Sequence, residues 1–370
     1  MSGAPSELRF DVTVDPGLED VAGAEAQERF QEAGISAYLE EKPLDLSGHI
    51  EVGTTANADV AGAVLRRLHS AYYVVRLYDS VVLAVDPGET AQHERPEAIL
   101  EPVYRRLKAL ELPELEAAAS FCVRTRRVGK HPFSSPEVER RAGEVLRRRF
   151  GTKVDLTSPE CTVRVDITDS IARVGILYGG DTLNKRFPWV WRPRVTLRNT
   201  IAYGMLRLGG YDSLPSGGTL LDPFCGSGTI LVEGASLRDD VTLLGSDWDE
   251  AAIEGARANI EACGYNERIT VSPANALEID RIYGEKRVSL IVTNPPFGVR
   301  MAKDTNMLGF YHSFLRAARR VVKPGGKLVI LVGRKRKLFN TAIAQLDEWN
   351  ITHVRIIEFG GVYPGLFVLE

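Results

Sequence analysis

The sequence predicts an α/β protein, with a doubly wound sheet in its C-terminal half and smaller α+β segments before it. Three observations predict this class. Short apolar strands alternate with helical segments from residue 219 onward. Glycines or polar residues follow these strands, at the edge where an open α/β sheet binds its ligands. The first 85 residues instead follow the order β-α-β-β-α-β, which is a ferredoxin-like order.

The N-terminal elements are bounded by glycines, prolines and polar turns, which set their expected ends. We expect strands at residues 8–14, 36–41, 49–53 and 72–85, and helices at residues 17–33 and 58–69.

The first strand of the C-terminal half ends in a glycine turn. The apolar strand 219–222 leads into residues 222–228 (Asp-Pro-Phe-Cys-Gly-Ser-Gly), and a helix is expected to follow. Gly226 and Gly228 let the backbone approach a ligand closely, and the helix begins directly after them. A dinucleotide-binding fold would have Gly-x-Gly-x-x-Gly here, and a P-loop would have Gly-Lys-Ser/Thr. Asp222 precedes the turn instead, and its carboxylate would repel a pyrophosphate but suits an ammonium group.

The next two strands also end in polar residues. Asp247 ends the second strand, 25 positions after Asp222, and an acid at this distance from a glycine turn is placed to bind ribose hydroxyls. Asp249 is the better N-cap of the following helix, residues 250–263. A third strand, 269–271, ends near Asn275.

The fourth strand, 288–292, ends in residues 294–297 (Asn-Pro-Pro-Phe). The two prolines end the strand because neither can donate to a ladder. The Asn294 amide oxygen and the Pro295 carbonyl then make a pair of acceptors on a stiff loop, which suits one planar NH2 group. Phe297 offers a face for the ring that carries this group. A plain strand-to-loop turn is the alternative for this motif taken alone.

These four strand ends together resemble class I S-adenosylmethionine-dependent methyltransferases, which have a Rossmann-like sheet, over about residues 196–370. The Asn-Pro-Pro-Phe motif is typical of members that methylate exocyclic amino groups or amide nitrogens. In these enzymes the acid at the end of the second strand binds ribose, and the residue at the end of the third strand contacts adenine. This residue is more often Asp in the family, whereas this chain has Asn275. The implied cofactor-binding residues are Thr196, Asp222, Phe224, Cys225, Gly226, Ser227, Gly228, Asp247, Trp248, Asn275, Ala276 and Asn294. The implied catalytic residues are Asn294, Pro295 and Phe297.

The charge of the chain is unevenly distributed. Residues 1–120 carry 10 Lys/Arg against 22 Asp/Glu, net −12, whereas residues 121–200 carry 17 against 8, net +9. Residues 201–370 carry 19 of each. A basic middle in an acidic protein indicates a local site for a polyanion. Solvated helix surface is the alternative for the arginines of residues 138–150.

The basic middle resembles the core of a THUMP domain, through residues 121–139 with their Gly-Lys-His-Pro segment, and through residues 154–159 and 161–167. This resemblance implies binding to the CCA end of tRNA. A glycine loop with a lysine beside a helix start can also hold a phosphate. The expected RNA-binding residues are Arg124, Arg126, Arg127, Lys130, His131, Lys185 and Arg186.

The sequence thus divides into four expected parts, and its linker is rich in prolines, aromatics and bases. The parts are a ferredoxin-like domain, residues 1–68; a THUMP domain, 69–180; a linker, 181–198; and a Rossmann-like methyltransferase domain, 199–370. In the linker, Trp189 and Trp191 are expected to pack on a domain face, although aromatics between arginines can also contact nucleic acid.

Together these parts resemble the TrmN group of tRNA guanine-N2 methyltransferases, which implies methylation of guanosine 6 in the acceptor stem of tRNA, with S-adenosylmethionine as cofactor. Three alternatives stay open. One is an adenine-N6 methyltransferase of nucleic acids, and another is a protein-glutamine methyltransferase, against which the basic middle argues. The third is a non-catalytic or thiouridine-type tRNA-binding protein, although the segment around Ser216 does not match the Ser-Gly-Gly-x-Asp-Ser of thiouridine synthetases.

Composition excludes several other classes. The four cysteines form no Cys-x-x-Cys pair and the six histidines are scattered, so we expect neither a disulfide framework nor a metal site. No apolar run approaches the 18 or so residues of a membrane span, and no signal peptide is evident. We expect a cytoplasmic monomer.

Overall fold

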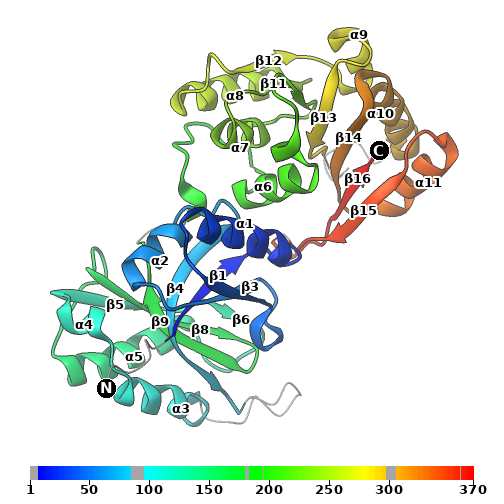
Figure 1. Ribbon diagram of the computed structural model, residues 1–370. Helices are drawn as coiled ribbons and strands as arrows, with labels where there is room; N and C mark the ends of the chain where they lie inside the picture. The colour runs from blue at the N-terminus through cyan, green and yellow to red at the C-terminus, as the bar shows by residue number, and fades with distance from the viewer. Residues whose placement is uncertain (1–6, 85–95, 180–182, 195, 297–305, 359) are drawn as a thin grey trace. The chain divides into compact units, whose positions relative to one another are not determined.

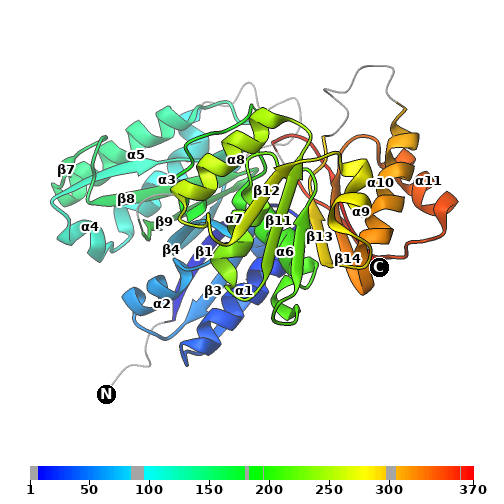
Figure 2. The same cartoon turned by 90° about the horizontal axis from the view of Figure 1, so that it is seen from above.

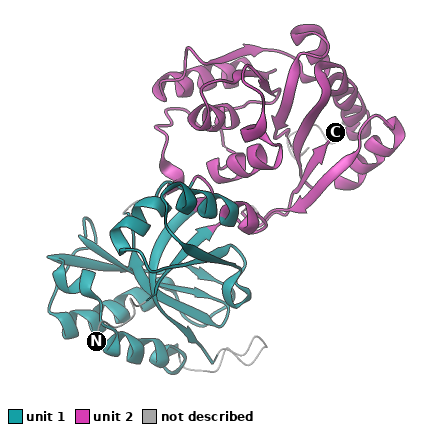
Figure 3. Ribbon diagram, viewed as in Figure 1, with its two compact units in different colours: residues 1–13, 23–68, 72–182 teal, residues 14–22, 69–71, 183–370 magenta. Residues whose placement is uncertain are grey.

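The computed structural model describes residues 7–84, 96–179, 183–194, 196–296, 306–358 and 360–370. The chain forms two compact units (Figure 3). Unit 1 comprises residues 1–13, 23–68 and 72–182, and unit 2 comprises residues 14–22, 69–71 and 183–370. The division places the predicted ferredoxin-like and THUMP segments largely in one unit.

The strands and helices up to β4 follow the predicted order β-α-β-β-α-β (Figure 1). The strands are β1 Leu8–Val14, β2 Ala37–Glu41, β3 His49–Thr54, β4 Ala71–Val82, β5 Ser120–Arg124, β6 Arg127–Val128, β7 Lys153–Val154, β8 Cys161–Thr168 and β9 Ile171–Leu177. The helices are α1 Glu19–Glu32, α2 Ala58–Leu65, α3 Pro96–Ala109, α4 Pro113–Ala117 and α5 Ser135–Phe150, with a 3-10 helix at Pro43–Asp45.

These strands form one nine-stranded sheet in the order β2-β3-β1-β4-β9-β8-β5-β7, and β6 pairs with β8. The long strand β4 lies between β1 of the predicted ferredoxin-like domain and β9 of the predicted THUMP domain, and pairs antiparallel with β9. The two predicted N-terminal domains therefore share a continuous sheet through β4.

Helix α5 shows how local sequence sets an element that carries much of the basic charge. Ser134 and Glu137 form a capping box at its start, and Gly151 ends it with φ 74°. Val138, Ala142 and Leu146 recur every four residues and are buried. The arginines of this helix consequently lie on its exposed face.

Unit 2 contains the predicted doubly wound sheet. Its strands are β10 Thr219–Asp222, β11 Thr242–Asp247, β12 Ile269–Pro273, β13 Val288–Thr293, β14 Val322–Val332, β15 Ile351–Ile356 and β16 Gly365–Leu369. Its helices are α6 Asn199–Leu208, α7 Thr229–Leu237, α8 Glu250–Ala262, α9 Ile279–Tyr283, α10 Met307–Val321 and α11 Arg336–Leu346, with 3-10 helices η3 Leu183–Lys185, η4 Tyr211–Ser213 and η5 Ala276–Glu278.

The strands of this sheet lie in the order β12-β11-β10-β13-β14-β16-β15. The pairs from β12 to β14 are parallel, and β16 pairs antiparallel with both β14 and β15, so that β15 and β16 close the sheet as a hairpin. Since the order reverses at β10, the crevice between β10 and β13 is the expected ligand position.

Helices cover both faces of this sheet, with α6, α7 and α8 on one side and α9, α10 and α11 on the other (Figures 1 and 2). Neighbouring residues of one strand belong to opposite cores: Leu220 packs with the first group and Leu221 with the second. This burial on both faces explains why the parallel strands read as continuous apolar runs. Within the described ranges, every helix is too short or too polar to cross a membrane.

Candidate active site

The glycine turn joins β10 to α7 as the sequence predicts. Gly226 has φ 49° and Gly228, the N-cap of α7, has φ 82°. Residues other than glycine rarely adopt backbone conformations with positive φ. The Gly226 N–H donates to Oδ2 of Asp247 at 3.0 Å. The turn is therefore held directly on the end of the neighbouring strand β11.

A cavity of about 90 Å³ lies between this turn and the linker. It brings together seven of the predicted site residues, namely Thr196, Asp222, Phe224, Cys225, Gly226, Ser227 and Asn294. Pro193, Leu197, Thr229 and Ile230 also line it. The strand ends of β10 and β13 thus meet at one cavity, at the position that the strand order predicts.

Asp222 is the buried acid of this cavity, with 1% of its surface exposed. The Thr293 hydroxyl donates to its Oδ1 at 2.7 Å and the Phe224 N–H donates to the same oxygen at 3.1 Å. Burial raises the pKa of Asp222 from 3.8 to about 7, although these two hydrogen bonds oppose the shift. A cation in the cavity would favour the ionised carboxylate.

Asp247 lies at the end of β11, where a ribose acid is expected. Each of its carboxylate oxygens accepts one backbone N–H, from Gly226 at 3.0 Å and from Asp249 at 3.1 Å. Burial raises its pKa, and these hydrogen bonds oppose the rise. A carboxylate oxygen has more than one lone pair, so both oxygens can still accept hydroxyl groups.

The other predicted cofactor residues lie on the neighbouring strand ends, outside the lining of this cavity. Trp248 follows Asp247 and is 78% exposed. Asn275 follows β12 and caps η5, because its side chain accepts from the Leu277 N–H at 3.0 Å. Ala276 is buried in the core beside β10 and β13. Asp249 caps α8 through the Ala251 N–H, as predicted.

Asn294 directly follows the buried strand β13. Its Oδ1 is buried and has no hydrogen-bond partner among the residues that the structure describes. A buried acceptor without a partner is costly, so a donor from a ligand is the natural partner for this oxygen. Pro295 is buried beside it, whereas Phe297 lies outside the described residues.

Cys225 occupies the cavity as a small residue. Burial, with Asp222 and Asp247 nearby, raises the pKa of its thiol well above the ordinary value. The thiolate needed for nucleophilic chemistry is therefore disfavoured.

The predicted RNA-binding residues of unit 1 lie on β5, β6 and the loop that follows. Arg126 and Lys130 are exposed. Arg124 donates to the Leu156 carbonyl at 2.7 Å, and Arg127 lies over the Phe133 ring at 5.7 Å. The His131 ring bonds the Asp169 carbonyl through Nε2 at 2.7 Å.

The two linker bases differ from each other. Lys185 is exposed. Arg186 donates to Glu233, a fully buried acid of α7, at 2.6 Å and lies over the Phe187 ring. Arg186 is therefore engaged in the packing of unit 2. Trp189 packs against the core and Trp191 against Gly255, which confirms the predicted packing of the linker aromatics on a domain face.

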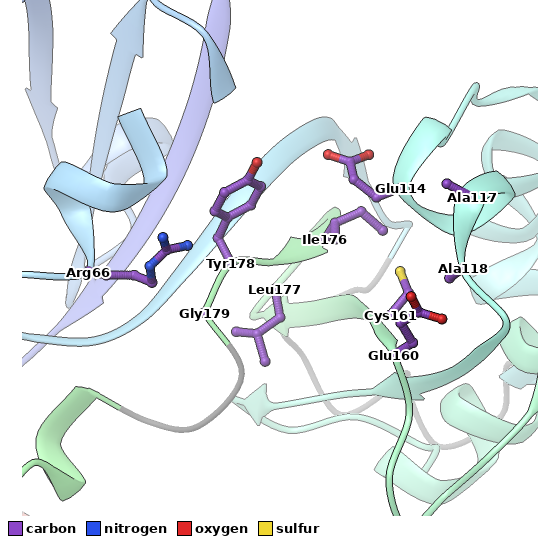
Figure 4. Close-up of a pocket in the computed structure, with 10 residues that line it drawn as sticks. All are labelled: Arg66, Glu114, Ala117, Ala118, Glu160, Cys161, Ile176, Leu177, Tyr178 and Gly179. Atoms are coloured by element: carbon purple, nitrogen blue, oxygen red, sulfur yellow. The ribbon is translucent and has the colours of Figure 1, made fainter. Parts of the chain in front are cut away.

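Unit 1 contains a separate cavity of about 280 Å³ (Figure 4). Its charged side chains already have partners. Glu114 accepts hydrogen bonds from Arg76 and from the Tyr78 hydroxyl, and Glu160 accepts from the Ala119 N–H. Arg66 lies over the Tyr178 ring at 5.8 Å. Its lining residues are all different from those of the cavity in unit 2.

Sequence reasoning missed two partners of the site. Thr293 was expected only as the residue between the strand and its motif, yet it holds Asp222. Asn259 was not singled out on its helix, yet it bonds the linker and the glycine turn. Neither residue has a local signal, because both partners are distant in the sequence. No metal-binding group of at least three His, Cys, Asp or Glu residues occurs in the described part of the chain.

This geometry defines a class of protein: a Rossmann-like methyltransferase domain preceded by a THUMP domain. Family models agree, since residues 190–364 match the RMKL-like methyltransferase domain and residues 97–177 match the THUMP domain.

Comparison with known proteins gives the particular family. A tRNA (guanine(6)-N2)-methyltransferase of Thermus thermophilus is 40% identical over 72% of this chain and 77% of its own length. One of Archaeoglobus fulgidus is 30% identical over 98% of this chain and 92% of its own. The crystal structure of TrmN from Thermus thermophilus matches with a TM-score of 0.76 and 33% identity, over 98% of this chain and 99% of that one. The chain belongs to the tRNA (guanine(6)-N2)-methyltransferase family.

Proposed function

We propose that this protein transfers a methyl group from S-adenosylmethionine to the exocyclic N2 of a guanosine in tRNA, at position 6 in the acceptor stem. The observation that carries the proposal concerns Asn294, which lines a cavity together with the glycine turn. Its Oδ1 is buried and has no hydrogen-bond partner in the described part of the chain. Membership of the family supports tRNA guanine N2 as the acceptor.

The residues of the cavity fit the cofactor by their chemistry. Asp222 would hold the ammonium of its methionine part, since an ionised carboxylate in a buried site favours a cation. Asp247 would accept the ribose hydroxyls, and Asn275 would contact the adenine. Thr196 and Leu197 of the linker would cover the methionine part. When bound, S-adenosylmethionine supplies an electrophilic methyl group on a sulfonium.

Asn294 and Pro295 prepare the acceptor nitrogen. The amide oxygen of Asn294 and the Pro295 carbonyl would accept the two hydrogens of the guanine amino group, which would turn the nitrogen lone pair toward the methyl group. As the N–C bond forms, the bond between sulfur and the methyl carbon would break to leave S-adenosylhomocysteine, and the nitrogen would release one of its two protons to solvent. A guanine flipped from its helix would stack on Phe297. Most of the rate gain then comes from alignment, because a fixed amino group attacks without a search for orientation.

Removal of the ribose acceptor should weaken cofactor binding. We expect Asp247→Ala to lower the affinity for S-adenosylhomocysteine by about 1–3 kcal/mol, the usual cost of stranding hydrogen-bonded partners. Asp249→Ala is the matched control, because it removes only the N-cap of α8 and should leave the affinity unchanged. Calorimetry measures both; equal affinities for wild type and Asp247→Ala would contradict the ribose assignment.

Unit 1 would bind the tRNA, and its CCA end in particular. A hollow of about 430 Å³ supports this proposal. Arg124, Arg140 and Arg147, from β5 and α5, line it together with Glu139 and Glu144, and the exposed apolar side chain of Leu156 lies beside them. Guanidinium groups beside an apolar surface suit the phosphates and bases of a single strand.

Arg124 in this hollow, together with the exposed bases Arg126 and Lys130, should determine the salt dependence of tRNA binding. We expect Ala at Arg124, Arg126 and Lys130 together to weaken tRNA binding and flatten its dependence on salt, because each lost phosphate contact releases fewer counterions. Cofactor affinity should stay the same. Arg281→Ala, which removes a 79% exposed arginine side chain of unit 2, is the control. If the triple variant had the wild-type salt dependence of tRNA binding, these residues would be solvated surface and would not contact tRNA.

Two further features of the protein in the cell are part of the proposal. We infer that it acts in the cytoplasm, since all four cysteines are free thiols, as a reducing compartment keeps them. We also infer that it acts as a monomer, because the residues proposed for both binding steps come from one chain.

The proposed function is tested by incubating tRNA and the protein with methyl-labelled S-adenosylmethionine. We expect the label in tRNA and none in protein. Absence of binding of S-adenosylmethionine or S-adenosylhomocysteine to the wild type in calorimetry would refute the methyltransferase assignment.

A further inference from the structure

The linker forms one wall of the cofactor cavity. Pro193, Thr196 and Leu197 line the cavity together with the glycine turn. The Thr196 hydroxyl donates to the Pro193 carbonyl at 3.2 Å, which joins these two wall residues. The shape of the cavity therefore depends on what holds the linker in place.

One buried side chain holds the preceding residues of the linker. Asn259 lies on α8 and is 0% exposed. Its Oδ1 accepts the backbone N–H groups of Val190 at 3.1 Å and Trp191 at 2.8 Å. Its Nδ2 donates to the Trp191 carbonyl at 2.8 Å and to the Ser227 carbonyl at 3.1 Å. Since Ser227 belongs to the glycine turn, a single amide joins this turn to the linker residues that directly precede the cavity wall.

The bonding capacity of Asn259 matches these partners. An amide offers two N–H donors and two acceptor lone pairs, and all of them are used here. The orientation of the amide follows from its partners, because two carbonyls and two N–H groups face it. A carboxylate at this position would oppose two carbonyl oxygens. Burial of an amide costs free energy unless its polar atoms form hydrogen bonds. The four hydrogen bonds to the linker and the glycine turn offset this cost for Asn259.

Gly255, one helical turn before Asn259, seats the side chain of Trp191. A Cβ atom at Gly255 would lie 2.1 Å from the Trp191 ring, so the ring lies directly on the helix backbone. Glycine destabilises the interior of a helix. The close contact with the Trp191 ring explains why a glycine occurs at this position of α8.

We propose that Asn259 and Gly255 are positioning residues for the cofactor: they clamp Val190 and Trp191 onto α8 and so fix the linker wall against the glycine turn. The proposal rests on the proposed function, because it takes the cavity as the site of S-adenosylmethionine. Neither residue lines the cavity. Their effect reaches the cofactor through Trp191 on one side and Ser227 on the other.

The first test replaces the amide. Asn259→Ala should raise the Kd for S-adenosylhomocysteine and the KM for S-adenosylmethionine about tenfold or more, which corresponds to the loss of one or two net hydrogen bonds. The kcat at saturating cofactor and the Kd for tRNA should stay near wild type. Ile253→Ala is the control, since Ile253 is buried on the same helix and a smaller side chain there lowers stability without touching the clamp. Wild-type cofactor affinity for Asn259→Ala, or equal weakening by Ile253→Ala, would overturn the proposal.

The second test uses the steric partner and does not depend on the folding of Asn259→Ala. Gly255→Ala should weaken cofactor binding about tenfold in the wild type but have no effect in a Trp191→Ala background, because the clash then disappears. Additive effects of the two changes would overturn the proposal. A wild type that binds no cofactor at all would refute the proposed function instead, so the two failures are distinguishable.

Discussion

Asn294→Ala is expected to lower the rate of methyl transfer by about 100-fold or more, which is typical of the loss of one oriented group in a transition state. Asn294 follows β13 and lines the cavity, and its Oδ1 is buried. Its removal takes away one of the two acceptors that align the guanine amino group, while the residues proposed to hold the cofactor and the tRNA stay in place. The loss should therefore appear in kcat rather than in either binding constant.

Single-turnover kinetics with saturating tRNA and cofactor measure this effect directly. Asn350→Ala is a matched control, because Asn350 is exposed at the start of the hairpin and the change should leave the rate unaltered. An Asn294→Ala variant with the wild-type rate would show that the Asn-Pro-Pro loop is a structural turn only. A loss confined to tRNA affinity would show that Asn294 binds the acceptor without aligning it.

Asp222→Asn is expected to weaken cofactor binding about 10- to 100-fold, since a hydrogen bond to a charged group is worth about 1.5–3 kcal/mol. In the wild type, binding should also weaken as the pH falls below about 7, because the carboxyl then takes up a proton. Calorimetry at several pH values measures both effects. A pH-independent wild-type affinity would contradict the assignment of Asp222 to the ammonium group.

The same substitution should stabilise the cofactor-free protein at neutral and alkaline pH. Burial raises the pKa of Asp222 from 3.8 to about 7, so the unfolded state releases the proton first as the pH rises. The stability of the folded state therefore falls between these two pH values, by up to about 4 kcal/mol in total. Asparagine does not ionise and avoids this loss.

Urea unfolding between pH 4 and 8 checks this expectation. The difference in free energy of unfolding between Asp222→Asn and wild type should be smallest near pH 4 and largest above pH 7. A difference that does not vary with pH would show that the buried carboxyl keeps an ordinary pKa.

The sheet of unit 2 could be predicted because each of its signals is local. A strand, its polar end and the next helix occupy adjacent residues, as at Asp222 and the glycine turn, or at Asp247 with the Asp249 cap. The ferredoxin-like order and the cap at Ser134 were predictable for the same reason. The pairing of β4 with β9 was not, because strand pairing depends on residues that are far apart in the sequence.

The partners of the site residues escaped prediction on the same physical ground. Thr293 and Asp222 are 71 positions apart, and the Asn259 amide reaches Trp191 across 68. Arg186 was predicted to contact RNA because it lies in a basic, aromatic segment. Only the fold shows Glu233, 47 positions later, in contact with its guanidinium. The contact of Arg186 with RNA stays a prediction. In the structure its guanidinium binds the buried carboxylate of Glu233.

Identification of the methylated nucleoside tests the central claim most directly. Bulk tRNA is incubated with the protein and methyl-labelled S-adenosylmethionine, digested to nucleosides and to oligonucleotides, and analysed by mass spectrometry. The account predicts N2-methylguanosine as the labelled nucleoside, in the acceptor-stem fragment that contains position 6. Label found only in N6-methyladenosine, or only in protein, would contradict it and assign the Asn294 site to a different acceptor.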